Sequence, residues 1–267
     1  MRIRGIDVSS FQGEIHWEEV KRDHIEFAIL RAGYGRFPNQ IDRRFEENYR
    51  EAKRHNIPVG AYLYSYATTV EEARQEARNL QGWLRGKRFE FPIYYDLEDQ
   101  SQAFLSKRRL TDIAIAFCDE MERAGYFVGV YANAYWLITK LDRDRLTPYT
   151  IWLADYAPEP SYRGEYKMWQ YTSRGKVAGI HGDCDMDYCY QDFPKIIKRA
   201  GLNGFERSDE PHPGHKPHIA VYTVQKGDTL IRIAERYHTT WQRIARENRI
   251  ADPRFIYPGQ KLKIYVE

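Results

Sequence analysis

The chain has 267 residues, of which 42% are hydrophobic and 30% are charged, a composition typical of globular proteins and not of disordered ones. Its formal net charge of +3 is too small to indicate nucleic-acid binding. No run of about 18 apolar residues is present, so no membrane span is expected. Aromatic residues make up 15% of the chain, which suits a carbohydrate-binding protein as well as an ordinary core.

Short apolar strands alternate with charged helical segments over the first 200 residues. In chain order, we predict strand Ile3–Val8, helix Trp17–Asp23, strand Phe27–Arg31, helix Asp42–His55, strand Val59–Ser65, helix Val70–Leu84, strand Ile93–Leu97, helix Thr111–Ala124, strand Phe127–Tyr131, helix Tyr135–Leu141 and strands Thr150–Ala154 and Lys167–Tyr171. Thr111 is predicted to cap its helix. Seven or eight such strands predict a parallel β/α barrel, irregular because some connections are too short for a helix.

The alternation stops near Leu202, where a stretch rich in Pro, Gly, His and charge follows. We therefore predict a barrel domain over residues 1–202, a linker over 203–219 and a small strand–helix–helix–strand domain over 220–267. The histidines His212, His215 and His218 indicate a solvated linker more than a metal site. Residues 220–267 carry nine basic and five acidic residues. This surplus of positive charge either favours binding to an anionic polymer or contributes only to solubility.

The chain has three cysteines, an odd and low number that excludes a disulfide scaffold. Cys118 lies in a helical pattern and is predicted to be a buried thiol. Cys184 and Cys189 flank an acidic stretch, and whether they pair is left open. Nucleophile-elbow, zinc-protease and Cys-x-x-Cys motifs are missing from the sequence, so we expect neither metal nor cofactor.

Acidic residues follow several predicted strands. Asp7 ends the first strand, Asp96 and Glu98 end the fourth, and Asp185 lies late in the chain. The carboxyl ends of parallel barrel strands share one face, so these acids are expected to meet there. Asp96 and Glu98 are two residues apart, about 6.6 Å on a strand, and mutual repulsion should raise one pKa. Glycoside cleavage needs a protonated acid beside a carboxylate, so the pair is a candidate catalytic site. The structural alternative is that Asp96 caps the following turn and Glu98 is solvent-exposed.

The segment Arg4–Gly13 closely resembles the start of the family-25 glycoside hydrolases, the muramidases of the Chalaropsis type. Further matches follow in order at Phe27–Gly35, Gly60–Ser65, Tyr95–Glu98, Gly129–Asn133, Trp152–Tyr156 and Trp169–Ser173. The resemblance covers about residues 3–200. It implies a flattened, irregular β/α barrel that hydrolyses the β-1,4 bond between N-acetylmuramic acid and N-acetylglucosamine in peptidoglycan.

The resemblance also implies residue roles. Glu98 matches the general acid, Asp96 its partner carboxylate, and Asp7 and Asp185 supporting acids. The implied substrate-binding residues are Tyr62, Tyr64, Tyr131, Trp152, Gln170 and Asp187, with core packing as the alternative for Tyr64 and Trp152. The family's late motif usually reads Val-Asp-Leu-Asn, whereas this chain has an acid, Asp187, in the last position, which leaves open which late acid faces the cleft.

Residues 221–265 resemble a LysM domain, beginning with Tyr222–Leu230 and ending near Leu262. Asp228 or Thr229 can cap its first helix. The resemblance implies that the domain binds N-acetylglucosamine-containing glycans. The implied contact residues are Gly227, Asp228, Thr229, Leu230 and Ile250. The alternative is a packing domain without a ligand.

The sequence predicts a wall hydrolase, expected to be a monomer, that acts on peptidoglycan strands. The alternatives are a chitinase-like glycosidase and a non-catalytic cell-wall or spore-coat binding protein. Three routes of attack on the sugar's anomeric carbon remain open: by a carboxylate, by water or by the substrate's own 2-acetamido group. The third route is favoured. Residues 1–7 lack the apolar segment of a signal peptide, so we expect cytoplasmic synthesis with holin-type or another non-classical release, as for a phage lysin, an autolysin or a spore enzyme.

Overall fold

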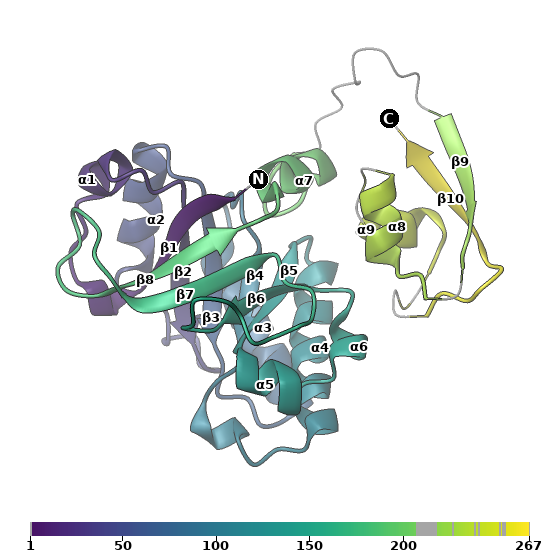
Figure 1. The fold of residues 1–267 in the computed structure, drawn as a ribbon, viewed down its shortest axis with the longest axis horizontal. Helices are drawn as coiled ribbons and strands as arrows, with labels where there is room; N and C mark the ends of the chain where they lie inside the picture. The colour runs from purple at the N-terminus through teal and green to yellow at the C-terminus, as the bar shows by residue number, and fades with distance from the viewer. Residues whose placement is uncertain are drawn as a thin grey trace.

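The computed structural model describes residues 2–206, 218–225, 227–237, 239, 241–250, 252 and 255–266. Within the first range, eight strands close into a barrel in sequence order (Figure 1). They are β1 (Ile3–Val8), β2 (Phe27–Tyr34), β3 (Val59–Tyr64), β4 (Ile93–Asp96), β5 (Val128–Asn133), β6 (Thr150–Ala154), β7 (Met168–Gly175) and β8 (Cys184–Cys189). The predicted α/β barrel is therefore confirmed.

The barrel is irregular at its closure. Strands β1 to β7 pair in parallel, whereas β8 runs antiparallel to both β7 and β1. No helix lies between β6 and β7 or between β7 and β8, and Figure 1 shows the long β7 and β8 crossing the front of the barrel. The eighth strand was not among the seven predicted by range, because its alternating acids interrupt any apolar run.

Helices connect most of the other strands. They are α1 (Trp17–Arg22), α2 (Phe45–Arg54), α3 (Val70–Leu84), α4 (Lys107–Arg123), α5 (Ala134–Thr139), α6 (Arg143–Leu146) and α7 (Phe193–Ala200), with short 3₁₀ turns η1 (Ser10–Gln12) and η2 (Gln100–Gln102). The prediction that Thr111 caps its helix is wrong. Helix α4 begins four residues earlier because the Ser106 hydroxyl accepts the Arg109 N–H, and the buried Thr111 hydroxyl donates to the carbonyl of Lys107 at 2.7 Å.

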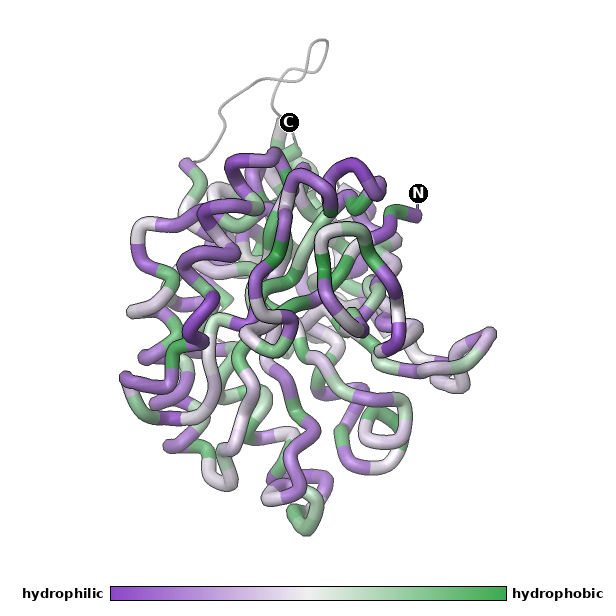
Figure 2. Tube along the Cα trace, turned by 90° about the vertical axis from the view of Figure 1, so that its left-hand side faces the viewer, coloured by the Kyte–Doolittle hydropathy of each residue, from purple (hydrophilic) through white to green (hydrophobic). Residues whose placement is uncertain are grey.

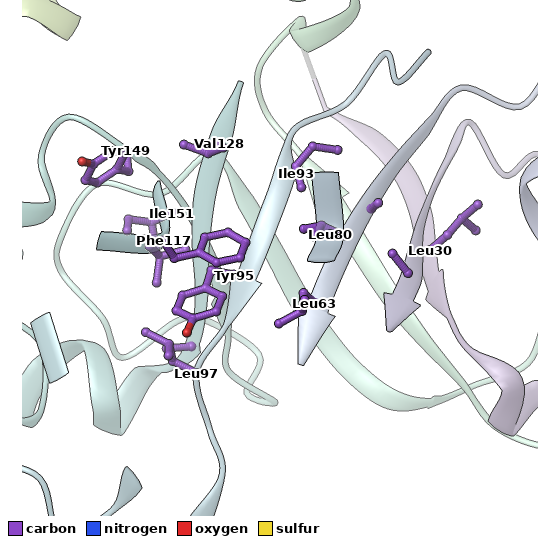
Figure 3. Packing of buried hydrophobic residues seen from close by; sticks show 14 of the residues in the cluster. Leu30, Leu63, Leu80, Ile93, Tyr95, Leu97, Phe117, Val128, Tyr149 and Ile151 are labelled. Atoms are coloured by element: carbon purple, nitrogen blue, oxygen red, sulfur yellow. The ribbon is translucent and has the colours of Figure 1, made fainter. Parts of the chain in front are cut away.

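Two clusters of buried apolar side chains hold the barrel together. Figure 2 shows hydrophobic and hydrophilic residues alternating along the chain. Between strands and helices, the rings of Tyr95 and Phe117 stack with centroids 3.8 Å apart (Figure 3). Inside the barrel, Phe27 stacks on Phe91 at 4.5 Å, and the ring of Tyr94 lies above them in the same cluster. Aromatic rings therefore fill the interior, and polar groups gather at one end of it.

Asn203 ties the last turn of the barrel domain to the segments that lead into β4 and β5. Its side-chain amide donates to the carbonyls of Phe89 and Phe91, and its Oδ1 accepts the N–H of Phe127 at 2.7 Å. The segment predicted as a linker thus begins with residues that pack on the barrel, including Phe205. The rest of that prediction, residues 207–217 with His212 and His215, lies outside the described residues, and His218 already belongs to a strand.

We expect Asn203→Ala to lower the thermal unfolding midpoint of the barrel by about 10 °C, because three buried backbone groups lose their partners, at a cost of about 4 kcal/mol. Asn56→Ala is the matched control. Asn56 has the same φ of 55° but an exposed side chain, so its replacement adds only backbone strain. Differential scanning calorimetry measures both, and equal shifts would contradict the anchoring role.

The C-terminal region folds as the predicted βααβ unit. Strand β9 (His218–Thr223) pairs antiparallel with β10 (Lys261–Val266), and helices α8 (Leu230–Arg236) and α9 (Trp241–Glu247) lie between them in sequence. Its core is the cluster Val224, Leu230, Ile233, Ala234, Trp241, Ile244, Ala245, Leu262 and Ile264. Among the helices that the structure describes, none has both the length and the apolar composition of a membrane span.

All three cysteines are free and buried. The prediction of a buried thiol at Cys118 is confirmed. Cys184 and Cys189, whose pairing the sequence left open, form no disulfide because they stand at opposite ends of β8.

Candidate active site

The barrel register brings the predicted acids to one end. Asp7 on β1 pairs with Asp185 on β8, and Asp96 at the end of β4 lies beside Tyr131 on β5. Glu98 follows β4 by two residues, and its pKa is raised by burial and then by the charge of Asp185, which lies on β8. The four acids are thus brought together, as their places at strand ends predicted.

Asp96 and Glu98 have different environments. Asp96 is 4% exposed, and its Oδ1 has no hydrogen-bond partner within the described part of the chain. Burial, followed by the charge of Glu98, raises the pKa of Asp96 well above its usual value, while Arg31 lowers it. Glu98 is partly exposed. Burial and then Asp185 and Asp99 raise the pKa of Glu98, and the nearby Tyr131 hydroxyl lowers it.

Glu98 is therefore the acid of this pair that is both accessible and able to hold a proton in mildly acidic solution. The alternative in which Asp96 caps the following turn is wrong, because Asp99 caps η2 by accepting the Ser101 N–H at 2.9 Å. The second oxygen of Asp99 accepts the hydroxyl of Tyr64 at 3.1 Å. The half-buried Tyr64 thus holds the loop that carries Glu98.

Gln170 joins Asp7 to two tyrosines of the site. Its Nε2 donates to Asp7 at 2.7 Å, and its Oε1 accepts the hydroxyls of Tyr131 and Tyr156. Burial, then Asp187 and Asp185, raises the pKa of Asp7 well above its usual value. Burial raises the pKa of the partly exposed Asp185 to about 6.

The predicted substrate-binding residues divide into two groups. Tyr62 and Tyr131 are 9% and 6% exposed and lie among the acids. Trp152 and Asp187 are 1% and 0% exposed, so the expectation that they contact substrate needs correction. The indole N–H of Trp152 donates to Asp187 at 2.7 Å, and the ring of Trp152 packs edge-on against those of Tyr62 and Tyr131. Trp152 and Asp187 therefore lie beneath the exposed part of the site and hold Tyr62 and Tyr131 in place.

Sequence reasoning missed a cation beside the acids. The guanidinium of Arg31 pairs with the buried Asp42 at 2.7 Å and lies 4.7 Å from the centre of the Phe11 ring, which is 84% exposed. Arg31 lowers the pKa of both Asp96 and Tyr62. An arginine within the apolar run of β2 was the available signal, since an unpaired charge is costly inside a barrel.

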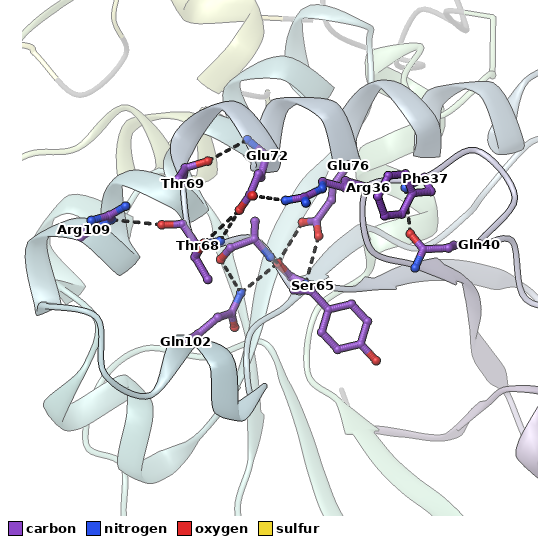
Figure 4. Close-up of polar contacts among 12 residues, drawn as sticks. Arg36, Phe37, Gln40, Ser65, Thr68, Thr69, Glu72, Glu76, Gln102 and Arg109 are labelled. Carbon is purple, nitrogen blue, oxygen red and sulfur yellow. Dashed lines mark hydrogen bonds and ion pairs between the residues drawn. The ribbon is translucent and has the colours of Figure 1, made fainter.

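A buried polar network positions the loops after β3 and β4 (Figure 4). The carboxylate of Glu76 on α3 accepts the hydroxyls of Ser65 and Tyr95 and the backbone N–H of Tyr66. Gln102 donates to Ser65 and to the carbonyl of Ala67. The two loops that carry Tyr64, Glu98 and Asp99 are therefore joined to each other and to α3.

The residues predicted to bind glycan in the C-terminal domain also divide. Leu230 is 3% exposed in the core, so the expectation of glycan contact is corrected for this side chain, and Ile250 packs on the same cluster. Thr229 caps α8 by accepting the Arg232 N–H at 3.3 Å. Asp228 accepts the Tyr222 hydroxyl and the Gln225 N–H. Gly227 is exposed with φ +89° and open space above it.

The acids do not resemble a metal centre. Within the described ranges, no group of three or more His, Cys, Asp or Glu side chains is arranged to hold a metal ion. An accessible carboxyl with a raised pKa beside buried carboxyl groups suits proton donation to a leaving oxygen and stabilisation of positive charge at carbon.

Comparisons with known proteins identify the family of each domain. The model of the glycosyl hydrolases family 25 matches residues 6–180, and that of the LysM domain matches residues 222–264. Lysozyme M1 of Streptomyces globisporus is 29% identical over 197 residues, which cover 68% of this chain and 66% of that protein. This chain thus spans about two thirds of the length of that relative.

Two solved structures share the fold. The CTP1L endolysin superposes with a TM-score of 0.66 at 26% identity, over 74% of this chain and 70% of that one. The autolysin LytC of Streptococcus pneumoniae, solved with a synthetic peptidoglycan ligand, superposes with a TM-score of 0.63 at 29% identity, over 71% of this chain and 47% of that one. The chain therefore belongs to family 25 of the glycosyl hydrolases, as a lysozyme-type glycoside hydrolase with a C-terminal LysM domain.

Proposed function

We propose that this chain cleaves the β-1,4 bond between N-acetylmuramic acid and N-acetylglucosamine in peptidoglycan, with Glu98 as general acid. The observation that carries the proposal is the position of Glu98: partly exposed, facing the charge of Asp185, and with a pKa raised mainly by burial. A carboxyl group with a raised pKa keeps its proton to a higher pH than an ordinary glutamate and can deliver it to the leaving glycosidic oxygen. The relatives named an endolysin and an autolysin support the choice of polymer.

The buried Asp96 is proposed to assist the substrate's own 2-acetamido group. Its Oδ1 lacks a partner among the described residues and could accept the acetamido N–H. The acetamido oxygen would then attack the anomeric carbon while the C–O bond to the leaving sugar breaks and Glu98 delivers its proton to that oxygen. Asp7 and Asp185 are proposed to stabilise the positive charge that develops, and Tyr62, Tyr64 and Tyr131 to line the sugar site. Gln170 is 3% exposed and is proposed to position Asp7 and Tyr131 beneath that site.

The LysM domain is proposed to hold the enzyme on N-acetylglucosamine-containing strands. A single weak module raises the local concentration of the barrel at the polymer without further contacts. The proposed site of action is the cell wall, the proposed state is a monomer, and no nucleic-acid partner is proposed.

Analysis of the cut bond tests this proposal. Purified peptidoglycan is digested, and the released muropeptides are reduced and analysed by mass spectrometry. Muramic acid at the new reducing ends is expected. N-Acetylglucosamine ends, or cleavage of chitin oligomers alone, would favour the chitinase-like alternative, and no band on a peptidoglycan zymogram would favour the non-catalytic binding protein.

We expect Gly227→Val to weaken wall binding by about tenfold. Valine is strained by about 1–3 kcal/mol at the left-handed φ of Gly227 and should displace the loop before α8. Gly259→Val is the matched control, since Gly259 is also exposed, has φ +88° and also has open space around it. Pull-down on purified walls measures both, and equal losses would contradict a glycan contact at the Gly227 loop.

A further inference from the structure

Asp7 and Asp187 form a pair of buried carboxyl groups beneath the accessible acids. Asp187 on β8 pairs in register with Gly5, and Asp7 is two residues further along the same face of β1. The two side chains are 4% and 0% exposed and lie close enough to share a hydrogen bond. Because a carboxylate only accepts hydrogen bonds, this contact requires a proton on one of the two groups.

Neutral donors hold the outer oxygens of the pair. Asp187 Oδ1 accepts the indole N–H of Trp152 at 2.7 Å, and Asp7 Oδ2 accepts the amide N–H of Gln170 at 2.7 Å. Asp187 Oδ2 receives no N–H or O–H from the residues that the structure describes. The proton of the pair is thus the remaining means of satisfying the inner oxygens.

The groups that face Asp187 are acidic or neutral. On the same side of the sheet as Asp187 they are Asp7 on β1, Tyr94 on β4, and Asp185 and Cys189 on β8, whereas Tyr171 on β7 and Cys184 on β8 interact with Asp187 from the other side. Burial, assisted by the charge of Asp185, raises the pKa of Asp187 to about 8, whereas the interactions with Trp152 and Asp7 lower it. Two adjacent buried carboxyl groups cannot both ionise without strong repulsion.

We infer that Asp187 is a positioning residue that shares one proton with Asp7 and thereby fixes Asp7 and the Trp152 indole in the active site. Loss of this proton in alkaline solution places two like charges in contact. Repulsion then displaces Asp7 and releases Trp152, against whose ring Tyr62 and Tyr131 pack. The effect on activity rests on the proposed function, whereas the effect on stability does not.

The variant Asp187→Asn keeps the shape and hydrogen bonds of the side chain but has no proton that is lost at alkaline pH. Its amide oxygen can accept from Trp152, and its N–H can donate to Asp7 at every pH. The ratio of variant to wild-type kcat/KM on soluble peptidoglycan should be constant below pH 7 and rise about tenfold by pH 9. The ionisation of Glu98 is common to both proteins, so the ratio removes it.

Thermal melting gives a second readout that needs no activity. A native pKa raised above the unfolded value means that wild-type stability falls as the pH rises from about 4 through about 8. The melting temperature of Asp187→Asn minus that of the wild type should therefore increase from pH 5 to pH 9. Asp183→Asn, an exposed aspartate paired with Lys176, is the control and should give flat curves in both assays.

Asp187→Ala should lose activity at every pH, and Asn should restore it. Flat curves for Asp187→Asn in both assays would overturn the inference. So would an inactive Asp187→Asn that melts like the wild type, since Asp187 would then take part in the reaction itself. If the wild type cleaves no peptidoglycan, the proposed function is wrong. The difference in melting temperature between Asp187→Asn and the wild type then tests the shared proton by itself.

Discussion

Glu98→Gln should lower kcat on peptidoglycan by about 10³-fold, because glutamine keeps the shape of the side chain but has no proton to give to the leaving oxygen. Binding to purified walls should be unchanged, since it is proposed to reside in the LysM domain. Loss of turbidity of a wall suspension measures the first quantity, and sedimentation with the walls measures the second.

Glu46→Gln is a matched control, because Glu46 is 61% exposed on α2 and pairs with Lys87 outside the barrel. Its activity should equal that of the wild type. The raised pKa of Glu98 also predicts how the activity of the wild type depends on pH. The activity should decline as the pH rises through this pKa, which lies above 4.5. Undiminished lysis by Glu98→Gln would refute its role as general acid.

The sequence predicted the barrel well where each strand is an apolar run between a helix and a loop, as for β3 and β4. It failed at β8, because Asp185 and Asp187 point to the polar end of the barrel and interrupt the apolar pattern. It also misplaced the start of α4, where Ser106 and Thr111 are both plausible caps and only the fold shows which one lies at the helix end.

The sequence predicted which residues belong to the site but not which of them are buried. Asp7, Asp96 and Glu98 follow strand ends, and parallel topology alone places strand ends together. Burial of Trp152 and Asp187 depends on how tightly the eight strands close. The contact between Arg31 and Asp42 joins side chains eleven residues apart across a loop, and no periodicity of strand or helix encodes such a contact.

The arrangement implies a conflict between stability and activity, which Asp96 should show most clearly. This carboxyl group is buried, has one oxygen without a partner in the described part of the chain, and has a pKa raised well above 3.8 by burial and then by Glu98. The native state therefore holds this proton more tightly than the unfolded chain. Stability from this group is complete below about pH 4 and is lost as the pH rises through the raised pKa.

Asp96→Asn should consequently melt at a higher temperature than the wild type at neutral pH, and the difference should grow with pH. Its kcat should nevertheless fall by about 10²–10³-fold, because an amide cannot lose a proton to form the carboxylate that stabilises developing positive charge and attracts the acetamido N–H. Asp112→Asn, at a partly exposed ion pair with Arg145, should change neither quantity. A variant that loses activity and melting temperature together would instead make Asp96 a structural residue, since a buried carboxylate kept for catalysis costs stability that its amide does not.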